Sequence, residues 1–101
     1  EQMEKLYLKG MVNLLSEAGE EIKQDFYLVE KVNHSTTYGI KIVKNKGNHY
    51  IEEYSGPIST SKSFVEELLL KFIDRKISAI SLIEIIDDII SEKLWKRNYH
   101  L

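Results

Sequence analysis

The chain has 101 residues, of which 43% are hydrophobic and 30% charged, and its formal net charge is −2. This size and balance predict one globular domain, and the negative charge argues against a dedicated nucleic-acid binder. The absence of cysteine excludes disulfides, thiolate catalysis and cysteine-based zinc sites, and the longest aliphatic run, residues 68–70, is too short to span a membrane.

The N-terminal stretch carries only weak helical periodicity, through Met3, Leu6 and Tyr7. We therefore expect residues 1–10 to be a leader, either disordered or derived from a tag. A single domain is expected over residues 11–95, followed by a C-terminal tail over residues 96–101.

Alternating apolar and polar residues from Met11 onward predict a series of strands joined by short turns. The expected strands are residues 11–16, 22–32, 38–43 and 49–54. The clearest alternation is in the third strand, where Tyr38, Ile40 and Ile42 share one face. The side chains expected on the inner face are Ile22, Phe26, Leu28, Tyr38, Ile40 and Ile42.

Two amphipathic segments, residues 63–76 and 78–93, carry apolar side chains over about half of a helical circumference. Ser63 followed by Glu66 matches a capping box, and residues 59–61 offer alternative caps. Ser78 is a candidate cap of the second helix, and Ser81 with Glu84 offers a capping box one turn later. Strands grouped before helices predict an α+β fold. We expect a four-stranded antiparallel meander followed by two helices packed on one sheet face, in two layers.

Several runs resemble a known family. Residues 38–44 read YGIKIVK and resemble the YGIxIxK strand of the domain of unknown function 6514 family, small proteins of clostridia and related Firmicutes. Residues 58–62 leading into residues 65–69 are similar to the start of its first helix. Residues 77–88 are similar to its closing helix, although proline is common there near Ala79. The resemblance spans residues 11–90, implies a bacterial, cytoplasmic protein, and carries over no catalytic residue.

Polar side chains that often carry chemistry are scattered along the chain. Four carboxylates share a face of the second helix and could hold a hard cation such as Mg²⁺ or Ca²⁺, but a solvated helix face explains them better. They are Glu84, Asp87, Asp88 and Glu92. The histidines His34, His49 and His100 lack metal-ligand spacing. The Ser/Thr run at 59–63 suits helix capping or, alternatively, phosphorylation. No nucleophile elbow or glycine-rich phosphate loop is present, so no cofactor or enzymatic activity is expected.

Two surfaces remain as candidates for contact with a partner. One is the second face of the sheet, where five lysines stand against two acids between residues 23 and 46. The other is aliphatic helix surface that a single sheet face does not cover. The candidate residues are Tyr27, Val29, Lys31, Lys41, Val43, Leu70 and Trp95.

These features favour a non-enzymatic module that binds another protein or a copy of itself. The alternative is a nucleic-acid-associated regulator that uses the lysine-bearing sheet face. A metal-dependent enzyme built on the acidic helix is the weakest hypothesis.

Overall fold

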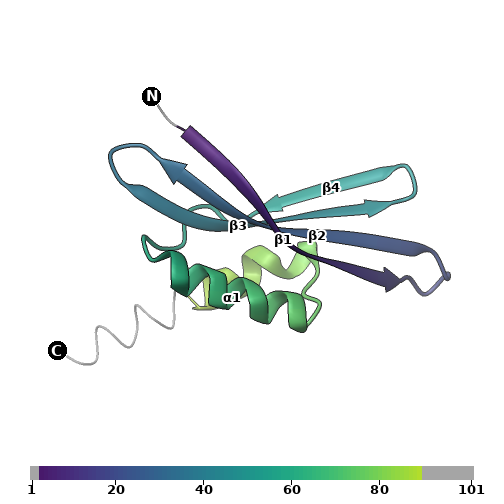
Figure 1. The fold of residues 1–101 in the computed structure, drawn as a ribbon. Helices are drawn as coiled ribbons and strands as arrows, with labels where there is room; N and C mark the ends of the chain where they lie inside the picture. Colours follow the sequence, from purple (N-terminus) through teal and green to yellow (C-terminus); the bar gives the residue numbers. More distant parts are fainter. Residues whose placement is uncertain (1–2, 90–101) are drawn as a thin grey trace.

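A computed structural model describes residues 3–89 of the chain. Its elements are β1 (Met3–Leu15), β2 (Glu21–Val32), β3 (Thr36–Lys46), β4 (His49–Tyr54), α1 (Lys62–Asp74), the 3₁₀ turn η1 (Ala79–Ser81) and a helix whose described part is 82–89. The strands form one antiparallel sheet in the order β1-β2-β3-β4, and both helices lie on the same side of it (Figure 1). The predicted α+β fold is confirmed.

The first strand differs from the prediction because it begins at Met3 rather than at Met11. Residues 3–10, expected to be a leader, pair with residues 26–32 of β2. The pairing register shifts between Leu8 and Gly10, so Lys9 is an extra residue in a β-bulge. This bulge reverses the alternation of side chains along β1. The bulge explains why the two-residue alternation typical of a strand does not continue through the sequence of β1.

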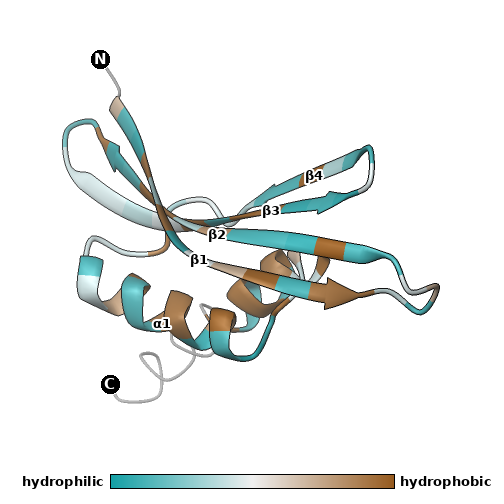
Figure 2. Ribbon diagram, turned by 45° about the vertical axis from the view of Figure 1, so that its right-hand side comes forward, coloured by the Kyte–Doolittle hydropathy of each residue, from teal (hydrophilic) through white to brown (hydrophobic). Residues whose placement is uncertain are grey.

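The hydrophobic core lies between the inner sheet face and the helices. Phe26, Leu28, Ile40 and Ile42 are fully buried there, as predicted. They pack against the helical layer, which lies below the sheet in Figure 2. The helical residues of this core are Val65, Leu69, Phe72, Ala79, Leu82 and Ile86.

The helix starts follow from side-chain caps. α1 begins one residue before Ser63, because the Ser61 hydroxyl accepts a hydrogen bond from the Phe64 amide at 3.3 Å. The Ser63 capping box is therefore wrong, and one of the alternative upstream caps is used. Ser78 caps the following turn as predicted, since its hydroxyl accepts from the Ser81 amide.

A buried glutamine joins the corner between the two helices to the sheet. Gln24 on β2 points inward and is fully buried. Its Nε2 donates to the carbonyl oxygen of Ile77 at 3.0 Å, and its Oε1 accepts from the amide of Ala79 at 3.1 Å. Both ends of this amide are thus satisfied, and the chain between the helices is positioned against β2.

Candidate functional site

The outer face of the sheet, the side that points away from the helices, carries the candidate surface. The strand register places Leu6 beside Val29, Leu8 beside Tyr27, and Tyr27 beside Lys41. In the described part of the chain, α1 and η1 contact the strands from the inner side of the sheet (Figure 2). Side chains from all four strands therefore meet on one surface that neither described helix covers.

An apolar strip runs along the β1 side of this face. It consists of Leu6, Leu8 and Met11, which we call the β1 strip. These side chains are 47%, 51% and 58% exposed. They lie on the outer face on both sides of the bulge, because the register shift moves the outward position from even to odd numbers. Exposed aliphatic side chains that gather on one face are typical of an interaction surface.

The β4 side of the outer face is polar, and its lysines are paired. Lys41 Nζ lies 2.6 Å from Glu52 Oε1, and the Tyr50 hydroxyl donates to Glu52 Oε2 at 2.8 Å. These two hydrogen bonds lower the pKa of Glu52, and the bond to Glu52 raises the pKa of both Lys41 and Tyr50. The Lys41 charge is therefore matched by a carboxylate on the neighbouring strand.

A second lysine on this face is also paired. Lys31 Nζ lies 3.6 Å from Glu4 Oε2 and 4.7 Å from the centre of the Tyr54 ring. Lys41 Nζ also lies near the Tyr54 ring, 5.9 Å from its centre. Carboxylates and an aromatic ring thus already satisfy the two lysines that the sequence singled out.

Between the apolar and polar halves lies a carboxylate with an unused acceptor. Asp25 is half-buried on β2, with Met11 opposite it on β1 and Val43 opposite it on β3. Its Oδ1 is buried and has no hydrogen-bond partner within the described residues. A buried acceptor without a partner costs about 1–3 kcal/mol.

The residues predicted for an interaction surface fall into four groups. Tyr27, Lys31 and Lys41 are half-buried on the outer face, where Tyr27 lies directly opposite Lys41 and Lys31 lies opposite Thr37. Val29 and Val43 also point outward, but they are buried, and Val29 is only 1% exposed. Leu70 is 60% exposed on α1, in the helical layer and therefore not part of this face. Trp95 lies outside the described residues.

Sequence reasoning missed the β1 strip, Asp25 and Tyr54. The alternation of Leu6 and Leu8 around Tyr7 is a short strand signal that could have identified the outer residues of β1. No sequence signal marks Asp25, because its isolation depends on which side chains lie across both neighbouring strands.

The other polar candidates do not converge. His34 and His49 are exposed at opposite ends of β3, next to the turns, and His100 lies outside the described residues. Three of the helical carboxylates, Glu84, Asp87 and Asp88, are exposed, whereas Glu92 lies outside the described range. Residues 3–89 contain no group of three or more side chains placed to bind a metal ion.

The comparisons with known proteins bear on family rather than on chemistry. Among the described residues, no helix has the length and apolarity needed to cross a membrane. Neither the curated proteins nor the solved structures provide a match. A family model described as a family of unknown function (DUF6514) matches residues 5–92, which include β1 from Lys5 onward. The chain therefore belongs to the DUF6514 family, as the strand and helix motifs indicated.

Proposed function

We propose that this protein is a non-enzymatic interaction domain that binds another polypeptide through the outer face of its sheet. The observation that carries this proposal is the β1 strip, Leu6, Leu8 and Met11, which is exposed on a face that neither described helix covers. A cytoplasmic setting is part of the proposal, and the absence of cysteine agrees with it.

The energy available at the strip is sufficient to support docking. Fully burying a side chain of this kind contributes about 1.5–3 kcal/mol. Because each of the three is about half exposed, covering the remaining half contributes roughly 1 kcal/mol per residue.

These features define the chemistry of the partner. Its contacting surface is apolar opposite the β1 strip. The strip also lies on an edge strand of the described sheet, so a partner can approach it from the face or from the side.

The pairing of the lysines makes nucleic-acid binding at this face the weaker hypothesis. Binding to phosphates depends on cations that release counterions when they bind. Lys31 and Lys41 instead have carboxylate partners on β1 and β4.

Substitutions on the two layers of the domain test the proposal. The double variant Leu6→Gln with Leu8→Gln removes two exposed contacts, and Leu70→Gln is the matched change on the helical layer. Light scattering after size-exclusion chromatography measures self-association, and affinity capture from the native cells measures binding to other proteins. We expect the complex to weaken about 30-fold in the β1 variant, because 2 kcal/mol is lost, and to persist in the α1 variant.

Two results would contradict the proposal. If only Leu70→Gln abolished the complex, the helical layer would be the binding surface. If the unmodified chain stayed monomeric and captured nothing, the outer face would have no partner.

A further inference from the structure

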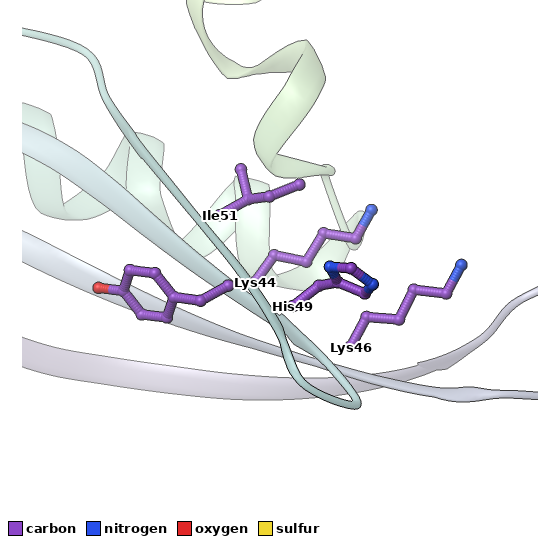
Figure 3. Close-up of a pocket in the computed structure, with 5 residues that line it drawn as sticks. Lys44, Lys46, His49 and Ile51 are labelled. Carbon is purple, nitrogen blue, oxygen red and sulfur yellow. The ribbon is translucent and has the colours of Figure 1, made fainter.

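The tip of the β3–β4 hairpin gathers basic side chains on the face opposite to the outer face. Lys46 pairs directly with His49 across the tip, and Lys44 pairs with Ile51 two residues further along. Figure 3 shows the side chains of Lys44, Lys46 and His49 extending to the same side of the hairpin, next to Ile51. The strand pleat produces this arrangement, because residues two apart share a face.

These side chains line an open cavity of about 340 Å³. Its wall consists of Lys44, Lys46, His49, Tyr50 and Ile51, and it includes no acidic residue. The volume falls near the lower end of the range for small-molecule sites. The cavity therefore combines several nitrogen donors with one aliphatic contact, at Ile51.

No carboxylate among the described residues forms an ion pair with the lysines at this tip. Within residues 3–89, Lys9, Lys31 and Lys41 each form an ion pair, whereas Lys44 and Lys46 form none. Basic groups placed side by side on one face repel each other. A bound anion relieves this repulsion and accepts hydrogen bonds from the same groups.

We propose that this cavity binds a small phosphate-bearing molecule, a phosphate monoester or a polyphosphate. Two ammonium groups and an imidazole N–H match the charge and the several acceptor oxygens of such a group better than those of a single carboxylate. Ile51 lies beside them and contacts the organic part of the ligand. Lys44 and Lys46 point to the other side of the sheet from the outer face, and of the wall residues only Tyr50 also belongs to the outer face.

A titration of the full chain with sodium pyrophosphate tests the site. Ionic strength is kept constant with sodium chloride, and the backbone amide signals of residues 44–51 are followed by NMR. We expect saturable shifts confined to the hairpin. The double variant Lys44→Gln with Lys46→Gln weakens this binding at least about tenfold, because two charge-assisted hydrogen bonds are lost.

The matched control is Lys5→Gln with Lys71→Gln, which removes the same charge from exposed positions on β1 and α1 that do not line the cavity. We expect it to bind pyrophosphate as the parent does. Non-saturable shifts, or equal weakening in both double variants, would show only diffuse attraction to charge and overturn the proposal. A single-stranded oligonucleotide that shifts the same amides at lower concentration than pyrophosphate would overturn the small-molecule assignment.

Discussion

Replacing Gln24 with leucine tests how the helical layer is joined to the sheet. The side chain is fully buried, and its two polar atoms bond the carbonyl oxygen of Ile77 and the amide of Ala79. Leucine has a similar volume but satisfies neither group. Each unsatisfied buried group costs about 1–3 kcal/mol, and the gain in apolar contact offsets about 1 kcal/mol. We therefore expect a loss of about 2–4 kcal/mol.

Urea denaturation followed by circular dichroism measures this loss. With a slope of about 1.5 kcal/mol per molar urea, a loss of 3 kcal/mol lowers the midpoint by about 2 M. Lys23→Ala, at the exposed neighbouring position, is the control, and it should change stability by less than about 0.5 kcal/mol. If Gln24→Leu were as stable as the parent, the two hydrogen bonds would not position the corner, and the reasoning would be refuted.

Three further predictions follow from single contacts. Gly39→Ala should lower the free energy of unfolding by about 2–4 kcal/mol in thermal melts, because the new Cβ meets the backbone carbonyl oxygen of Gly56; an unchanged melting temperature would contradict the close approach. Asp25→Ala should raise the melting temperature by removing the unsatisfied acceptor; a lower melting temperature would argue against an unused carboxylate. The Lys41–Glu52 coupling, measured by a double-mutant cycle, should be present at neutral pH. Because folding lowers the pKa of Glu52, the coupling should disappear as the pH falls below the ordinary value of 4.5, and persistence in strong acid would contradict the ion pair.

The inner half of the fold was predictable because its signals are local. Tyr38, Ile40 and Ile42 alternate with Gly39, Lys41 and Val43, so the inward face of β3 follows from the large apolar side chains at every second position. The apolar periodicity of the helices likewise indicated which side of each helix packs on the sheet.

The outer half was not predictable for reasons that involve more than one strand. The bulge at Lys9 moves the outward positions of β1 by one residue, so Leu6, Leu8 and Met11 do not share a single period. The alternation of β2 and β3 correctly places Val29 and Val43 on the outer face, but does not indicate that neighbouring side chains cover them.

The charge of each sheet face was likewise not predictable from the residues of one segment. Counting lysines between residues 23 and 46 indicated one basic face, but the pleat divides them between two faces. Carboxylates from β1 and β4 neutralise Lys31 and Lys41, and these strands were outside the counted segment. Within the described residues, Lys44 and Lys46 on the opposite face form no ion pair, and neither does Lys23 on the outer face.

Site-specific photo-crosslinking tests most directly whether the outer face is the binding surface. Because the chain has no cysteine, Leu8→Cys and Leu70→Cys each provide one attachment point for a thiol-reactive photo-crosslinker, on the sheet and on the helical layer respectively. After irradiation in an extract of the native cells, we expect a covalent adduct of defined mass from position 8 and none from position 70. An adduct from position 70 alone, or from neither position, would contradict docking through the outer face of the sheet.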